Sequence, residues 1–209
     1  MRWWEERVVP RLVQASLRGE ELAPHRDRAC AQLSGAVLEL GFGSGLNLAH
    51  CPPGIVRIDA VEPSDLAWRL SQDRRAATSV PVTRVGLDGQ RVDADDATYD
   101  AVLSTFTFCT IPDPMRALSE VRRVLRPGGA LFFLEHGLAP TATVRRWQRR
   151  CEPVQRRVAG GCHLTRDLPD LVTAADFDIT DLEQGYLPGP RLTRPFTYCS
   201  AGRAVVRTG

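Results

Sequence analysis

Lysine is absent from this sequence, and all 27 basic residues are arginine. The protein therefore has no lysine for a Schiff base or for general-base catalysis. The arginines are balanced by 25 acidic residues, which leaves a formal net charge of +2, so we expect no nucleic-acid partner. Arginine codons are GC-rich, and their exclusive use indicates a bacterial genome of high GC content.

Long apolar runs and paired cysteine motifs are also missing. No stretch approaches the roughly 20 apolar residues of a membrane span, and we recognise no signal-peptide pattern. The six cysteines form no C-x-x-C motif and show no metal-ligand spacing, so we expect reduced thiols in the cytoplasm and no metal site. The 209 residues, of which 43% are apolar, suffice for one domain with a sizeable core.

The most informative segment is a strand-like run, Val37–Leu40, that leads into a glycine-rich turn. Its glycines, Gly41, Gly43 and Gly45, allow positive φ and a close approach of the backbone to a ligand. Leu46–His50 follows and is predicted to start a helix whose free N–H groups face the turn. Strand, glycine loop and helix together form a cradle for a nucleotide-like ligand.

An acidic residue at the end of the next strand supports this interpretation. Such a residue binds ribose hydroxyls, and Glu62, followed by Pro63, ends the strand 58–61. A dinucleotide-binding fingerprint would need a glycine where Leu46 stands, which disfavours a nicotinamide-dependent reductase. Glu39 lies two positions before the first glycine. The arrangement resembles motif I of the class I S-adenosylmethionine-dependent methyltransferases.

Three further segments resemble this family in the same order. The loop 86–90 resembles the one that offers an aspartate to the adenine amino group. Residues 96–103 resemble the family's acid-x-Ser-Phe-Asp-x-Val strand, with Thr98 and Tyr99 substituting. Residues 114–129 resemble its helix and Arg-Val-Leu-x-Pro-Gly-Gly turn. The resemblance runs from about residue 35 to residue 206.

The resemblance implies S-adenosylmethionine as the cofactor. Gly41, Gly43 and Gly45 would approach its methionine part, and Glu39 would help to fix the loop and the amino group. The remaining contacts would come from Glu62 and Pro63 at the ribose, Asp88 and Gly89 at the adenine, and Ser104, Thr105 and Phe106, whose backbone would close the site.

Five short strands, around 37–40, 57–61, 82–85, 99–104 and 130–135, alternate with helices. Alternation predicts a parallel sheet with helices on both faces. Strands near 179–186 and 196–206 would close it as an antiparallel pair. We expect an α/β fold: a Rossmann-like, seven-stranded, mostly parallel sheet with an antiparallel C-terminal strand. The single domain, 1–209, would comprise a helical lid (1–33), a cofactor-binding core (34–136) and acceptor-side helices with closing strands (137–209).

The helices carry local signals. Trp3–Gly19 is predicted helical with a break or restart at Pro10, and 20–33 forms a second helix. Asp113 is the predicted N-cap of the helix 114–125, with Pro114 at its first position. A further helix covers 165–175. In the helix 144–158 we predict an apolar stripe, opposite an arginine-rich face that is either solvated or contacts an anionic lipid or acidic partner. The stripe comprises Val144, Trp147, Cys151, Val154 and Val158.

Two histidines are candidates for catalysis. Methyl transfer needs alignment and exclusion of water, and a base only if the acceptor arrives protonated. His136 ends the fifth strand at the predicted site, and His163 lies in a loop that leads into a helix. The unperturbed pKa of histidine suits a general base, although a structural hydrogen bond is the alternative for each. Cys109 and Cys162 are expected to be small buried hydrophobic residues.

Two short motifs resemble one branch of the family, the animal microsomal alkyl-thiol methyltransferases and their bacterial relatives. They are Phe-x-Glu-His at 133–136 and Gly-Cys-x-Leu-Thr-Arg at 161–166. That branch implies a small apolar acceptor, with a thiol favoured over O-, N- or C-methylation of a lipid, quinone or secondary-metabolite intermediate. We expect a monomer or homodimer with at most weak membrane-surface contact. Trp3 and Trp4 would form an active-site lid or make this weak contact, and core packing is the alternative. A cofactor-binding sensor or assembly partner is the non-enzyme alternative.

Overall fold

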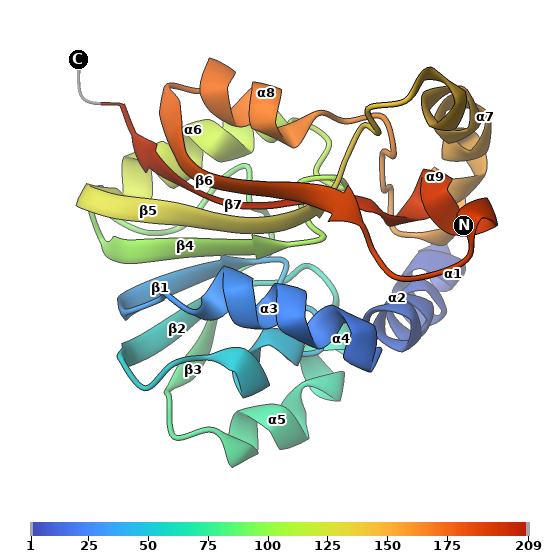
Figure 1. Cartoon of the computed structure of the whole chain (residues 1–209). Helices are drawn as coiled ribbons and strands as arrows, with labels where there is room; N and C mark the ends of the chain where they lie inside the picture. The colour runs from blue at the N-terminus through green and yellow to red at the C-terminus, as the bar shows by residue number, and fades with distance from the viewer. Residues whose placement is uncertain (1, 208–209) are drawn as a thin grey trace.

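A computed structural model describes residues 2–207, with the side chains of Arg2, Trp3 and Glu5 excepted. The predicted contact of the Trp3 side chain therefore lies outside the described residues. Seven strands form one sheet in the order β3-β2-β1-β4-β5-β7-β6 (Figure 1). The strands are β1 (Gly35–Leu40), β2 (Ile55–Val61), β3 (Val82–Gly86), β4 (Tyr99–Thr105), β5 (Leu125–His136), β6 (Phe177–Tyr186) and β7 (Tyr198–Val206).

The pairing confirms the predicted mostly parallel sheet. β1 to β5 pair in parallel, whereas β7 runs antiparallel to both of its neighbours, β5 and β6. β5 begins five residues before the predicted start at residue 130. Leu125 pairs with Tyr99, and the register then shifts before Ala101 pairs with Ala130, so the Arg126–Gly129 turn becomes an irregularity within the strand.

Side chains alternate between two apolar cores, one on each face of the sheet, because successive residues of a strand point to opposite faces. Leu131 and Phe133 belong to one core, while Phe132 and Leu134 belong to the other. The helices are α1 (Arg2–Arg7), α2 (Val9–Leu17), α3 (Ala23–Cys30), α4 (Asp65–Leu70), α5 (Gln72–Ala77), α6 (Pro114–Val124), α7 (Ala142–Val158), α8 (Leu168–Ala174) and α9 (Arg194–Thr197).

Helices on the two faces and at one end of the sheet define where a ligand can bind. α6 and α8 cover one face and contribute to its core, whereas α3 packs on the other face (Figure 1). α1, α2 and α7 lie together at one end of the molecule (Figure 1). Ligands of open α/β sheets bind beyond the carboxyl ends of the strands, at the point where strand order reverses. In this sheet β1 and β4 flank that point.

Several local predictions are confirmed. Asp113 caps α6 by accepting a hydrogen bond from the Arg116 N–H, and Pro114 begins the helix. Pro10 lies in the first turn of α2, where the N-terminal helical region restarts after α1. Asp176, which follows α8, has a left-handed φ of 62°, a conformation that aspartate adopts more readily than most residues other than glycine.

Helices elsewhere are shorter than the sequence indicates. The predicted helix after the glycine loop is only a 3-10 turn, η2 (Leu46–His50), because Cys51 already returns to extended backbone. Region 20–33 divides into a 3-10 turn, η1 (Glu20–Leu22), and α3. α8 begins at Leu168 rather than at 165, because Asp167 caps it.

The apolar stripe predicted for α7 is wrong in part. Trp147, Val154 and Val158 are 50%, 61% and 40% exposed, whereas Gln148 is the buried residue of the helix. The Gln148 amide donates to the Gly137 carbonyl and accepts from the Ala139 N–H, so polar contacts rather than the apolar stripe anchor α7. Contact of this surface with a membrane stays a prediction. Within residues 2–207, no helix combines the length and apolar character needed to cross a bilayer.

Candidate active site

A cavity of about 580 Å³ opens at the carboxyl ends of the parallel strands. Pockets of this size accommodate drug-sized ligands. Residues of α2, including Val9 and Val13, form one wall, and the Ala159–Cys162 region after α7 forms another. The predicted site residues that line the cavity are Gly41, Gly43, Glu62, Pro63, Asp88, Gly89, Thr105, Phe106 and His136.

The glycine loop after β1 has the backbone conformation that the sequence predicts. Gly41 and Gly43 have φ of +70° and +59°. A Cβ on Gly41 would lie 1.9 Å from Thr107 Oγ1, so glycine is also needed there for space. A Cβ on Gly43 would meet only the Gly41 carbonyl oxygen, at 3.8 Å. The Gly43 backbone therefore faces open space in the cavity. Gly45 also has positive φ but is not among the residues that line the cavity.

Glu62 joins the first two loops of the site. Its Oε2 accepts a 2.6 Å hydrogen bond from the Gly43 N–H, and its Oε1 accepts a 2.7 Å bond from the Ser64 N–H. The residue is only 5% exposed, and this burial raises the pKa of Glu62 despite the two backbone donors. Each carboxylate oxygen can accept more than one hydrogen bond, so this arrangement is compatible with a hydroxyl ligand.

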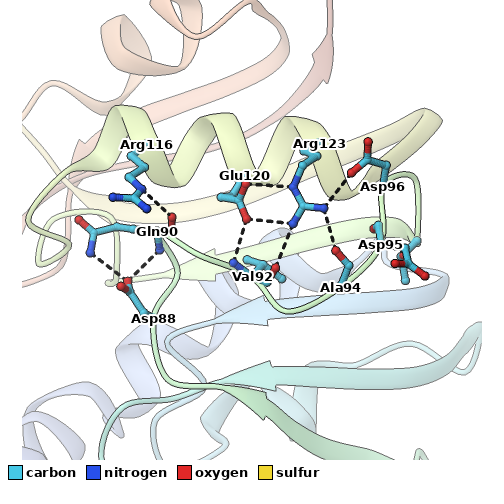
Figure 2. A network of polar contacts seen from close by, with 10 residues as sticks. Asp88, Gln90, Val92, Ala94, Asp95, Asp96, Arg116, Glu120 and Arg123 are labelled. Carbon is cyan, nitrogen blue, oxygen red and sulfur yellow. Dashed lines mark hydrogen bonds and ion pairs between the residues drawn. The ribbon is translucent and has the colours of Figure 1, made fainter.

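Asp88 lies on the loop after β3, at the cavity rim. Its Oδ1 accepts hydrogen bonds from both the backbone and side-chain nitrogens of Gln90, each 2.9 Å long (Figure 2). These bonds lower the pKa of Asp88. Gln90 in turn accepts from the Asp113 N–H and from Arg116 Nε, which anchors the loop to the start of α6.

The rest of the connection between β3 and β4 is held by Arg123 of α6. Its guanidinium donates to the carbonyls of Val92 and Ala94 and pairs with Glu120 and Asp96 (Figure 2). Glu120 also accepts from the Val92 N–H, at 2.9 Å. One helix therefore fixes a long loop, and with it the position of Asp88.

Glu39 lies below the cavity rather than in its wall. It is 1% exposed, and burial raises the pKa of its carboxyl to about 8. Asn47 donates from Nδ2 to Glu39 Oε1 at 2.7 Å and to Thr105 Oγ1 at 2.9 Å, and its Oδ1 accepts from Arg26. Arg26 and Asn47 line the cavity but were not predicted from the sequence. Each is a polar residue in a short helical segment, and no local signal marks it as buried.

Glu135, next to His136, organises the loop after β4. Its carboxylate accepts hydrogen bonds of 2.8 to 3.2 Å from the Ser104 hydroxyl and from the N–H groups of Thr107, Phe108 and Cys109. Burial nevertheless raises the pKa of Glu135. Ser104 is thereby occupied below the cavity and does not line it.

Phe106 has a left-handed φ of 54°, a strained conformation for an aromatic residue. Its ring packs against the His136 ring with centroids 4.8 Å apart. Such strain persists only where the surrounding structure imposes it, and here the hydrogen-bonded loop that follows β4 does so. The contact fixes the orientation of the histidine ring at the cavity wall.

His136 lies beside two thiols that also line the cavity. Its Nδ1 is 3.8 Å from Cys162 Sγ, and the ligand atoms of Cys109, His136 and Cys162 all lie within 4.8 Å of one another. Contact with the Cys109 thiol, and to a smaller extent with His136, lowers the pKa of Cys162 to about 5, although burial alone would raise it. The two cysteines are buried, as predicted, but they form a polar cluster with the histidine rather than a purely apolar contact.

His163 lies away from the cavity wall. Its Nδ1 contacts Glu152 Oε1 at 3.2 Å, and Glu152 also accepts from the N–H and hydroxyl of Thr165. The His163 N–H donates to the Cys109 carbonyl at 2.8 Å. These contacts are the structural hydrogen bonds that we considered as the alternative to a role as general base. His163 is not among the residues that line the cavity.

Comparison with known proteins now identifies the family. A methyltransferase-domain model matches residues 38–133. The thiol S-methyltransferase TMT1B of Rattus norvegicus is 33% identical over 175 residues, which are 81% of this chain and 70% of the relative. The chain belongs to the S-adenosylmethionine-dependent methyltransferases. The human thiol S-methyltransferase TMT1A is 32% identical over 78% of this methyltransferase and 68% of its own length.

Solved methyltransferase structures share the fold. A putative methyltransferase from Haloferax volcanii, solved in complex with the activator Trm112, superposes with a TM-score of 0.72. The superposition covers 99% of this chain and 97% of the other, at 18% identity. This likeness confirms the Rossmann-like architecture of the methyltransferase.

The cavity fits the methyl donor that the family uses, S-adenosylmethionine. The open space beside Gly43, the buried carboxyl of Glu62 and the exposed carboxyl of Asp88 follow one another along the strand ends. In the predicted arrangement, these groups would face the methionine, ribose and adenine parts of the donor in that order. Bound there, S-adenosylmethionine would supply an electrophilic methyl group.

Proposed function

We propose that this methyltransferase methylates a small apolar thiol. The observation that carries the proposal is the apolar part of the cavity lining, to which α2 contributes Val9, Val13 and Leu17 and the loop after β4 contributes Phe106 and Ile111. An apolar acceptor would bury its body against these side chains. The thiol S-methyltransferase relatives support sulfur as the acceptor atom.

The polar groups of this region are concentrated at His136 and its neighbouring thiols. A thiol has an ordinary pKa near 8.5, so a modest shift suffices to deprotonate it at neutral pH, whereas a phenol near 10 needs more help. We assign to His136 the role of promoting this deprotonation. The thiolate sulfur would then form the new bond to carbon while the donor's carbon–sulfur bond breaks.

Glu62, Pro63, Asp88 and Gly89 are proposed cofactor contacts, together with the glycine loop and the backbone after β4. Glu39 and Ser104 are assigned an indirect role, because the first holds Asn47 and the second bonds Glu135. His163 is assigned to positioning, through Glu152 and the Cys109 carbonyl.

The test is methyl transfer from labelled S-adenosylmethionine to an aromatic thiol and its matched phenol between about pH 6 and pH 9. We expect turnover of the thiol alone, with His136→Ala lowering the rate most strongly at the acidic end. Turnover of the phenol alone, or of a lipid or quinone but neither aromatic compound, would overturn the assignment of a thiol acceptor. His50→Ala is the matched control, because it removes a histidine that pairs with Asp27 and is not among the residues that line the cavity.

A further inference from the structure

Three potential metal ligands converge at the acceptor end of the cavity. Cys109 comes from the loop after β4, His136 from the end of β5, and Cys162 from the loop after α7. Their ligand atoms all lie within 4.8 Å of one another, and all three residues line the cavity. The sequence offers no metal-ligand spacing because each ligand belongs to a different structural element.

The distances suit a tetrahedral metal centre. Zinc–sulfur and zinc–nitrogen bonds of about 2.3 and 2.0 to 2.1 Å place sulfur and nitrogen about 3.6 Å apart at a tetrahedral angle. The separation of His136 Nδ1 from Cys162 Sγ is 3.8 Å. Two thiolates and one imidazole are the donors that zinc prefers, and two thiolates balance the charge of a divalent ion.

The surrounding hydrogen bonds hold the ligands in place without a metal ion. The Cys109 N–H donates to Glu135, and the Cys109 carbonyl accepts from the His163 N–H. Glu152 accepts from the backbone and hydroxyl of Thr165, which ties down the loop that carries Cys162. The Phe106 ring orients His136. Such outer contacts fix ligand orientation in metal sites.

We propose that Cys109, His136 and Cys162 bind one thiophilic divalent cation, of which Zn²⁺ is the preferred example, with a fourth position open to the cavity. Three protein ligands and one open position are typical of catalytic rather than structural zinc. Resting on the proposed function, we assign the open position to the sulfur of the acceptor. A thiol that binds a metal loses its proton. His136 would therefore promote deprotonation of the acceptor thiol by holding the metal ion.

The first test measures metal binding without any activity. The protein is purified under reducing conditions, stripped of metal and titrated with Co²⁺, whose thiolate charge-transfer and visible bands report tetrahedral sulfur coordination. We expect saturation at one Co²⁺ per chain and displacement by Zn²⁺. Substituting a residue that only supports a metal ligand weakens metal binding by up to roughly 100-fold. Cys162→Ser and His136→Ala each remove a ligand and should therefore weaken Co²⁺ binding by more than this. Persistence of the same spectrum in Cys162→Ser would overturn the site.

The chain contains matched controls. Cys30 and Cys51 form a second pair of neighbouring thiols, without a histidine partner among their described contacts. Cys30→Ser and Cys51→Ser should therefore leave the cobalt spectrum unchanged. Binding of S-adenosylhomocysteine to each variant shows whether it is folded. A folded wild-type protein with titratable thiols and no cobalt bands, or with a Cys109–Cys162 disulfide that reforms in preference to metal binding, would refute the proposal.

A second measurement separates this inference from the proposed function. Adding the aromatic thiol to the cobalt protein should shift the charge-transfer band, whereas the matched phenol should not. Thiol methylation that continues at full rate after metal removal would refute the metal's role and leave the thiol acceptor standing. A cobalt site of the expected stoichiometry in a protein that methylates no thiol would instead refute the acceptor assignment alone.

Discussion

The backbone N–H of Gly43 donates a 2.6 Å hydrogen bond to Oε2 of Glu62, 19 residues further along the chain. The bond connects the loop after β1 to the end of β2, which are the two segments predicted to hold the methionine and ribose parts of the cofactor. A single carboxylate therefore both shapes the glycine loop and faces the ligand cavity.

Replacing this carboxylate tests both of its roles. In Glu62→Ala, we expect the affinity for S-adenosylhomocysteine in calorimetry to fall by about 1.5 to 3 kcal/mol, because a charge-assisted contact is lost and the Gly43 N–H loses its acceptor. Asp65→Ala is the control, since the Asp65 side chain is 75% exposed, pairs with Arg84 and is not among the residues that line the cavity. Equal affinities of Glu62→Ala and wild type would rule out the ribose role.

Gly41 and Gly128 allow backbone strain to be separated from steric overlap. Both have positive φ, +70° and +83°, but a Cβ on Gly128 would meet nothing within 4 Å. Gly128→Ala should cost about 1 to 2 kcal/mol of stability from backbone strain alone. We expect Gly41→Ala to lower the melting temperature further and to weaken cofactor binding, because its Cβ would overlap Thr107. Equal melting temperatures would show that Thr107 moves aside freely.

Glu39 should make stability depend on pH in a defined direction. Folding raises its pKa from 4.5 to about 8, so the folded protein binds more protons than the unfolded chain between these values. Stability contributed by this group therefore falls as pH rises from about 4.5 to about 8, with a slope of up to ~1.4 kcal/mol per pH unit. Above that range the contribution is constant.

The variant Glu39→Gln retains an oxygen that can accept from Asn47 but does not titrate. Its free energy of unfolding in urea, relative to wild type, should increase steadily across this pH range. Glu183→Gln, on the exposed part of β6, provides a control for removal of one acidic group. A pH-independent difference between Glu39→Gln and wild type would mean that Glu39 is ionised in the folded protein throughout.

Glu135 should contribute more to stability than any one of its donors. In Glu135→Gln, one oxygen and an amide nitrogen must replace two acceptor oxygens that now serve four donors, so at least one buried N–H loses its partner. We expect a loss of about 2 to 4 kcal/mol, against about 1 kcal/mol for Ser104→Ala, which removes a single donor. Chemical unfolding would measure both values, and similar losses would show that the loop after β4 does not depend on the carboxylate.

Local chemistry made much of this molecule predictable. Strands β1 and β2, the cap at Asp113 and the glycine loop depend on neighbouring residues and on backbone preferences, and they lie where the sequence indicated. Most of the residues predicted to contact the cofactor line one cavity, because the carboxyl ends of parallel strands meet at one edge of the sheet. The buried face of α7 was not predictable in the same way. Gln148 is buried because it forms hydrogen bonds with the backbone of Gly137 and Ala139, and the apolar pattern of the helix does not indicate these bonds.

The sequence by itself determined the fold class, the family and the order of the segments predicted to bind the cofactor, because these depend on short patterns along the chain. Only the tertiary structure decided which buried polar groups meet. Arg26 reaches Glu39 through Asn47, and Cys109, His136 and Cys162 gather from three separate elements. Contacts between residues far apart in sequence depend on how the strands and loops are placed in space, and no local pattern encodes that placement.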